Sequence, residues 1–417
     1  MNSLRRNRDF LLLQVGQLLS SAGGQAAAVA YPLVVLAVTH SPALAGVVSF
    51  ARMVPSVLFG PLSGVLSDRV NRKALMIISD AFRAVAVGSI ALTLGLNVLP
   101  YWQIPIVAFV EGAFSSVFNP AAAGMLRSIV PVEDLSSAVA TQQARSSVAQ
   151  LGGPPAGGAL YAASRAFPFL IDAASYFFSM VAVILLRTRS SHVTSERDGR
   201  WRLRTDLAEG WRFLWTQPFL RTTTFLYGLT NPIGPGILLA LVVVSQQEEL
   251  PSTIIGALLA TFSGCLLIGS LLSGVVRRRL SPRAIMLLEL LAWPGPLLFT
   301  LWPNAYVLAA SILPVALAIP ATDSVVVAQR LAATPDRLVG RVESVRSTIA
   351  LVLAPFGSLA AGVLLDAMSA RPAILIFALP TVPLAIWGLL SPALRNLAVH
   401  RVEHRTGVGQ AVPDDRG

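Results

Sequence analysis

Twelve apolar segments, each long enough to cross a lipid bilayer, recur along this chain of 417 residues. A helix needs about twenty apolar residues to span the hydrocarbon core, and in lipid it must satisfy its own backbone hydrogen bonds. The chain is 54% hydrophobic and only 13% charged, about half the charged content of a soluble domain. We therefore predict an all-α integral membrane protein with twelve transmembrane helices, at about 10–37, 42–66, 74–96, 103–126, 135–162, 167–186, 218–244, 253–276, 284–301, 305–329, 341–365 and 372–390.

The basic residues gather in every second connection between these segments. A formal net charge of +11 would suggest a nucleic-acid partner in a soluble protein, but membrane proteins keep positive charge on the cytoplasmic side. The pattern therefore excludes nucleic-acid binding and predicts a multi-pass protein of the inner (plasma) membrane with both termini in the cytoplasm. The residues that form it include Arg5, Arg6, Arg8, Arg69, Arg72, Arg187, Arg189, Arg277, Arg278, Arg279, Arg395 and Arg401.

A polar stretch divides the segments six and six. We predict an N-terminal six-helix bundle, a cytoplasmic linker, a C-terminal six-helix bundle and a disordered tail, over residues 1–187, 188–216, 217–390 and 391–417. Apolar residues recur at helical spacing in the linker, at Leu203, Leu207, Trp211 and Leu214. This spacing predicts an amphipathic helix on the inner leaflet; a site for a regulatory partner is the alternative.

The two halves also resemble each other in sequence. A shift of 210 residues aligns Gly24 with Gly234 and Gly46 with Gly256, and a shift of 204 aligns Gly158 with Gly362. Internal repeats of this length are typical of transporters built from duplicated halves. They predict two pseudo-symmetric bundles.

The connection between the second and third segments reads Gly64-Val65-Leu66-Ser67-Asp68-Arg69-Val70-Asn71-Arg72-Lys73. It resembles the signature loop of the major facilitator superfamily, Gly-x-Leu-Ala-Asp-Arg-x-Gly-Arg-Lys, with Ser67 in place of Ala and Asn71 in place of the second Gly. Asn tolerates a left-handed backbone, so we expect the turn to be retained. The resemblance implies the major facilitator fold and a cytoplasmic gate that contains Gly64, Asp68, Arg69, Arg72 and Lys73.

The fifth segment contains Gly153-Pro154-Pro155-Ala156-Gly157-Gly158. This resembles the Gly-Pro-x-x-Gly-Gly motif of the superfamily's antiporters, although the glycine often found upstream is Ala149 here. The glycines permit close helix contact and the proline permits a kink. The motif, at Gly153, Pro154, Gly157 and Gly158, is therefore either a hinge beside the substrate or a packing device alone.

Glycine and proline interrupt the first and seventh segments at matching positions. Such breaks mark substrate contacts in duplicated transporters, and close packing at small residues is the alternative. The residues that we assign to the substrate cavity on this basis are Gly24, Gln25, Asn231 and Gly234.

Charged side chains inside a bilayer are costly and usually functional. Glu111 is the first candidate for proton coupling, with Arg52 or Arg145 as its partner, and Asp323 is the second. A static ion pair is the alternative. Asp80 and Arg83 are spaced to pair on one helix face, and Asp172 is predicted to anchor its helix at the membrane surface.

The strongest overall resemblance is to the branch of macrolide-efflux proteins and the enterobactin exporter, through Phe118-Asn119-Pro120-Ala121 and Asp172-Ala173-Ala174-Ser175-Tyr176. It implies export of an amphipathic drug, antibiotic or siderophore in exchange for protons, by alternating access. An importer or facilitator of a small metabolite is one alternative, and a non-transporting scaffold or sensor is another. The only lysine, Lys73, lies outside any P-loop motif, so we expect no use of ATP; we also expect no enzymatic activity, cofactor or metal.

Overall fold

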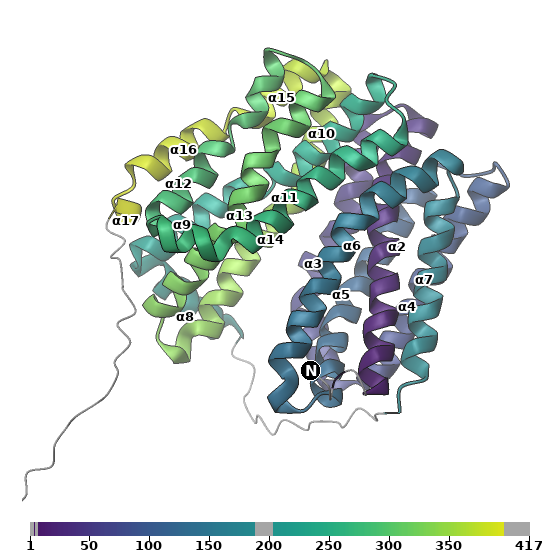
Figure 1. Ribbon diagram of the computed structural model, residues 1–417, viewed down its shortest axis with the longest axis horizontal. Helices are drawn as coiled ribbons and strands as arrows, with labels where there is room; N and C mark the ends of the chain where they lie inside the picture. Colours follow the sequence, from purple (N-terminus) through teal and green to yellow (C-terminus); the bar gives the residue numbers. More distant parts are fainter. Residues whose placement is uncertain (1–3, 5–6, 188–202, 396–417) are drawn as a thin grey trace, which may run out of the picture.

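The computed structural model describes residue 4, residues 7–187 and residues 203–395 (Figure 1). It does not describe the side chains of residues 61, 64, 65, 68, 69, 203–207, 336, 337 and 351. Every regular element within this part of the chain is a helix. The elements are α2 (Arg8–Thr39), α3 (Pro42–Arg69), α4 (Arg72–Gly95), α5 (Gln103–Ile129), η1 (Val132–Asp134), α6 (Leu135–Ala163), α7 (Phe167–Ile184), α8 (Leu203–Thr216), α9 (Pro218–Thr230), α10 (Ile233–Gln247), α11 (Ser252–Arg279), α12 (Pro282–Ala292), η2 (Gly295–Thr300), α13 (Ala305–Ala333), α14 (Asp336–Ala367), α15 (Ala370–Ala378), α16 (Thr381–Leu390) and α17 (Pro392–Arg395).

These elements confirm the predicted class and order of helices. Eleven helical segments among the described residues are long and apolar enough to cross a membrane. The predicted fifth segment is also helical, as α6, but is not one of the eleven. It carries a row of polar side chains, Gln142, Arg145 and Ser146, that faces a cavity inside the protein.

One of the two predicted helix breaks is present. The helix is interrupted between α9 and α10 at Asn231 and Pro232, although both residues keep right-handed helical dihedrals. The predicted break at Gly23–Gln25 is wrong, because α2 continues through it. Two further proline-associated breaks, at Pro294 and Pro380, separate α12 from η2 and α15 from α16.

The helices fall into two groups that follow the chain (Figure 1). In the first, α2 packs on α6 and α7, and α5 packs on α3 and α4; in the second, α11 and α12 pack on α13, and α10 packs on α14. The principal contacts between the groups are α3 with α14 and α6 with α11. The groups meet at one end and diverge toward the other, which we call the linker end because α7 ends and α8 begins there.

A pair of glycines lies at each of the two principal contacts between the groups. The Cα of Gly362 would lie 3.2 Å from a Cβ built on Gly46, and the Cα of Gly158 would lie 3.2 Å from a Cβ built on Gly256. The sequence repeat aligns Gly46 with Gly256 and Gly158 with Gly362, so one contact is the repeat of the other. Backbones approach this closely only where side chains are absent, and the agreement supports the predicted pseudo-symmetry.

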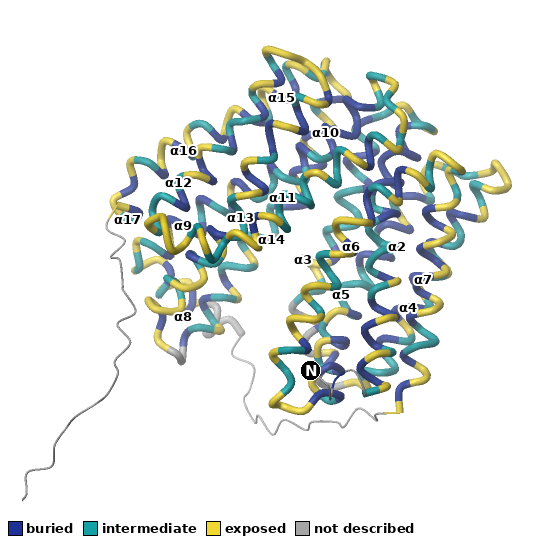
Figure 2. The backbone as a smooth tube through the Cα atoms, in the orientation of Figure 1, coloured by how far each residue is buried: buried dark blue, intermediate teal, exposed yellow. Residues whose placement is uncertain are grey.

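Large apolar side chains are exposed along the outside of the helices. Figure 2 shows exposed residues along the lengths of the helices as well as in their connections. Val85 and Leu271, for example, are 74% and 75% exposed. A water-soluble protein would expose no apolar surface of this extent, whereas a surface in contact with lipid requires it.

The linker contains the predicted helix, α8, which packs on α9 and α14. Leu214 is fully buried, whereas Trp211 and Trp215 stack on each other and are each nearly half exposed. Residues 188–202 of the predicted linker and residues 396–417 of the predicted tail lie outside the described residues. The tail begins with α17, whose Leu394 is buried.

Candidate functional site

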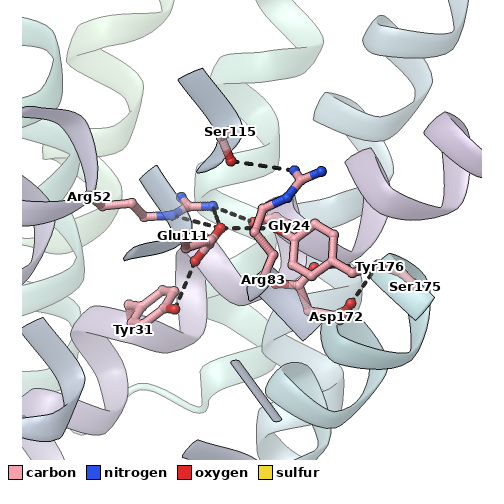
Figure 3. Close-up of polar contacts among 9 residues, drawn as sticks. All are labelled: Gly24, Tyr31, Arg52, Arg83, Glu111, Ser115, Asp172, Ser175 and Tyr176. Carbon is pink, nitrogen blue, oxygen red and sulfur yellow. Dashed lines mark hydrogen bonds and ion pairs between the residues drawn. The ribbon is translucent and has the colours of Figure 1, made fainter. Parts of the chain in front are cut away.

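An ion pair between the half-buried Arg52 and the buried Glu111 joins α3 to α5 in the first group of helices (Figure 3). The Arg52 guanidinium donates to Glu111 Oε1 from NH2, at 2.8 Å, and from Nε, at 3.3 Å. Glu111 is 2% exposed. The neighbouring Gly112 permits this approach, because a Cβ there would lie 2.2 Å from the Arg52 carbonyl oxygen.

Two tyrosine hydroxyls complete the surroundings of the Glu111 carboxylate. Tyr31 from α2 donates to Oε2 at 2.8 Å, and Tyr176 from α7 donates to Oε1 at 3.1 Å. Arg52 also donates to the carbonyl oxygen of Gly24 at 3.1 Å. A buried ion pair is tolerated only when further hydrogen bonds satisfy its remaining groups. Here α2 and α7 provide those hydrogen bonds to the pair formed by α3 and α5.

A second buried pair lies beside the first. Arg83 binds Asp80 one turn earlier on α4, which confirms the predicted local pairing. Arg83 also donates to Ser115 at 3.4 Å, and its guanidinium lies 4.4 Å from the ring centres of Phe118 and Tyr176. It therefore reaches the interior of the first group, a role that the sequence analysis did not assign to it.

Two cavities adjoin the Arg52–Glu111 pair. The polar cavity, of about 400 Å³, lies within the first group and is lined by Gln17, Ser20, Ser21, Gly24, Gln25, Arg52, Arg83, Glu111, Ser115, Phe118, Asn119, Ala122, Gln142, Arg145, Ser146, Ala149 and Tyr176. The apolar cavity, of about 260 Å³, lies between the groups, with Val29, Pro32, Val48, Met53 and Pro154 on one side and Pro235, Leu238, Leu239, Val242, Leu259 and Phe262 on the other. Gln25 and Arg52 line both cavities.

Neither of the remaining coupling candidates is paired with Glu111, although Arg145 lines the same polar cavity. Arg145, on α6, donates to the Gln17 side chain of α2 and forms no ion pair with Glu111, so the carboxylate's partner is Arg52. Asp323, on α13, is exposed and lines neither of the two cavities.

The substrate-cavity candidates are divided between the two groups. Gly24 and Gln25 line the polar cavity. Asn231 instead donates its amide to the Ala350 carbonyl, and Gly234 packs near Trp293; neither lines either cavity. The second group contributes apolar side chains, which the sequence could not separate from lipid-facing ones. Among the second group's residues named above on the apolar cavity, only Pro235 could be anticipated from the sequence, because it lies within the predicted break.

The motif on α6 packs against two other helices at once. A Cβ at Gly153 or Gly157 would lie within 2.4 Å of α2, and one at Gly158 would lie 2.2 Å from the Ser252 carbonyl oxygen of α11. Pro154 lines the apolar cavity. The motif therefore combines close packing with a position on the cavity wall.

The described part of the signature loop makes contacts within the first group. The surroundings of Gly64 and the side chains of Asp68 and Arg69 lie outside what the structure describes. Arg72 donates to the carbonyl oxygens of Ser67 and Gly124, and Lys73 donates to those of Ile184 and Leu186, at 2.9 and 2.7 Å. The left-handed backbone expected at Asn71 is wrong: its φ is −56°, and its side chain caps α4 by accepting from the Ala74 amide.

Asp172 is not a surface anchor, contrary to the prediction. It is fully buried on α7, where Gly23 packs against it and the Ser175 hydroxyl donates to its Oδ1 at 3.4 Å. Its Oδ2 has no hydrogen-bond partner among the described residues. It belongs to the same polar interior as Glu111 (Figure 3).

Comparisons with known proteins identify the family. The sequence profile of the Major Facilitator Superfamily matches residues 13–250. The chain is 28% identical to the multidrug efflux pump Tap of Mycobacterium tuberculosis, covering 95% of this chain and 96% of Tap. It is 27% identical to the uncharacterized MFS-type transporter YfiS of Bacillus subtilis, covering 66% of each. It is 29% identical to macrolide efflux protein A of Streptococcus pyogenes, covering 30% of each.

Solved structures agree with this fold. A bacterial homolog of the human lysosomal transporter Spinster, inward-facing and unoccupied, matches with a TM-score of 0.73 and 15% identity, covering 94% of this chain and 97% of that one. A bacterial homologue of ferroportin, also inward-facing, matches with a TM-score of 0.68 and 16% identity, covering 92% and 98%. The protein belongs to the Major Facilitator Superfamily and has the fold of its transporters.

Proposed function

We propose that this protein exports amphipathic small molecules in exchange for protons, by alternating access between two six-helix bundles over residues 1–187 and 217–390. The observation that carries the proposal is the buried Arg52–Glu111 pair, which lies where the polar and apolar cavities adjoin. The efflux pumps among its relatives support the direction of transport. The arginine asymmetry supports a cytoplasmic linker end.

The charge balance of the pair suggests how a proton could be coupled to transport. Glu111 carries one negative charge and Arg52 one positive charge, and the tyrosine hydroxyls donate to the carboxylate. Arg52 and Glu111 lie in the same group of helices, so the step that separates them is a movement of the Arg52 side chain within that group. If this side chain turns away during the transport cycle, a proton on Glu111 removes the uncompensated buried charge. Return of Arg52 then releases that proton. Alternating access thereby moves one proton against one cycle of substrate movement.

Arg52 also connects this exchange to both cavities. Its guanidinium lines the apolar and polar cavities and holds the Gly24 carbonyl of α2. A substrate that enters the cavities would therefore contact the same side chain that holds the coupling carboxylate. Antiport requires that the substrate binds the form in which Glu111 is ionised and holds Arg52, so that substrate binding and protonation of Glu111 exclude each other.

The test uses purified protein in liposomes with an internal pH dye. A pH gradient is imposed, and probes of both charges are added in separate experiments: erythromycin and ethidium, which are cationic, and an amphipathic naphthalenesulfonate, which is anionic. We expect probe movement to dissipate the gradient, and we expect Glu111→Gln to abolish that dissipation while probe exchange without a gradient persists. The surface carboxylate variant Glu133→Gln is the matched control, since Glu133 is exposed in η1.

Glu111→Gln leaves Arg52 without its counter-charge, so the double variant Arg52→Gln/Glu111→Gln provides a charge-balanced version of the test. Gradient dissipation that persists in both variants would refute the assignment of Glu111. Accumulation of the probe in the direction of the cytoplasm would instead support the importer.

A further inference from the structure

The polar cavity contains one more positive charge than its ion pairs neutralise. Its charged lining residues are Arg52, Arg83, Arg145 and Glu111. Arg52 is paired with Glu111. Arg83 is paired with Asp80, which does not itself line the cavity. Arg145 is the remaining cation, and none of the described carboxylates forms an ion pair with it.

Arg145 is also incompletely hydrogen-bonded. Its NH1 donates to the neutral Gln17 side chain, and its buried Nε has no acceptor among the described residues. A guanidinium has five N–H donors in a planar fork that matches a carboxylate or phosphate group. Arg145 is half-buried on the cavity wall, and a charge there that lacks a counter-charge and part of its acceptors is costly unless a ligand or water supplies them.

The neighbours of Arg145 favour a polar head group over an apolar one. Gln142 and Ser146 flank it on α6, and Asn119 of α5 lines the same cavity. These side chains offer neutral hydrogen-bond donors and no further negative charge. The other buried carboxylate of this region, Asp172, lines neither of the two cavities and forms no ion pair with Arg145.

The apolar cavity supplies the complementary half of a binding site. Gln25 and Arg52 line both cavities, so these two side chains are the boundary that a ligand occupying both cavities would contact. Apolar side chains from both groups of helices, such as Val29, Leu239 and Phe262, would surround its body. Ligand sites commonly combine such an apolar lining with a few placed polar groups.

We propose that the substrate class is an amphipathic anion, whose acidic group binds Arg145 in the polar cavity and whose apolar body occupies the apolar cavity. This assignment rests on the proposed transport function but concerns ligand charge, which transport alone does not fix. It excludes a lipophilic cation as the preferred substrate. The bound acid neutralises the one cation in the lining of the polar cavity that forms no ion pair with a described residue.

The test measures binding to the full chain in nanodiscs of zwitterionic lipid, by equilibrium dialysis, with binding to empty nanodiscs subtracted. Three probes share one apolar body and differ only in the head group: naphthylbutanoate, naphthylbutanamide and naphthylbutylammonium. We expect the wild-type protein to bind the carboxylate at least about tenfold more tightly than the amide, because a hydrogen bond to a charged group is stronger than one to a neutral group. The ammonium should bind most weakly.

Variants then assign that preference to Arg145. Arg145→Gln should remove the preference for the carboxylate and leave amide binding unchanged, whereas Arg145→Lys should retain most of it. Arg165→Gln is the matched control, since Arg165 is exposed between α6 and α7. Elution as a single species in size-exclusion chromatography checks the folding of each variant.

The two proposals fail separately in this design. Equal binding of the three probes, tighter binding of the ammonium, or a carboxylate preference that survives in Arg145→Gln would overturn the anion assignment, whatever the flux assays show. A carboxylate preference that depends on Arg145, in a protein without proton-driven flux, would support the site and refute the antiport mechanism. The binding assay needs no gradient, so it does not depend on coupling.

Discussion

Replacement of Gly158 by alanine should shift the protein away from the conformation described here. A Cβ at this position would lie 2.2 Å from the Ser252 carbonyl oxygen of α11, about 1 Å short of an ordinary C···O contact. The clashing atom belongs to the backbone, so no side-chain rotation relieves it. Overpacking of this kind costs about 1–3 kcal/mol.

The penalty applies to this conformation in particular, because the contact joins the two groups of helices. A conformation in which α6 and α11 separate at this end avoids the clash. A cost of about 1–3 kcal/mol changes a two-state equilibrium by about 5- to 150-fold. Gly152→Ala is the matched control: it lies on the same helix and gains the same helix propensity, but its Cβ would have nothing within 4 Å.

Distances between spin labels at the linker end report the equilibrium. Labels at Ser136→Cys and Arg278→Cys, in a Cys265→Ser background, occupy the exposed linker-end turns of α6 and α11. We expect Gly158→Ala to convert most of the long-distance population into a shorter one, and Gly152→Ala to match the parent protein. Identical distance distributions in all three proteins would refute the argument from packing.

Three further substitutions follow from contacts in the first group, and thermal unfolding in detergent measures each. Lys73→Met removes both hydrogen bonds to the C-terminal carbonyls of α7 and should cost about 1 kcal/mol, with the label distances unchanged because the contact lies within one group. Tyr31→Phe leaves Oε2 of the buried Glu111 without its donor and should cost about 1–3 kcal/mol; stability equal to the parent would show that the bond contributes nothing. Gly112→Ala places a Cβ 2.2 Å from the Arg52 carbonyl oxygen and should cost about 1–3 kcal/mol, and a stability unchanged by it would contradict the close α3–α5 approach.

The sequence was sufficient for the fold because the bilayer reduces the choice to helices of a required length. It was insufficient for local geometry. Gly23 and Gly24 suggested a break, yet α2 remains helical there, and the absent side chains leave room for Asp172 and the Tyr176 hydroxyl instead. At Asn71, an N-cap replaces the expected left-handed turn.

The candidate site was predictable in its charged half only. Charged residues are rare inside a membrane, so Arg52, Glu111 and Arg145 could be singled out, although only packing decides which arginine meets the carboxylate. Leu239 and Phe262, on the opposite wall, have the same composition as helix faces that contact lipid. Periodicity cannot distinguish an apolar side chain that faces a cavity from one that faces the membrane.

The two glycine pairs between the groups have a mechanical consequence. Gly46 against Gly362 and Gly158 against Gly256 bring the backbones of the two groups together at matching places. Two such points define a line, and a rotation of one group about that line would leave both contacts in place while the linker ends move. A bulky residue at one of the two points would displace the line.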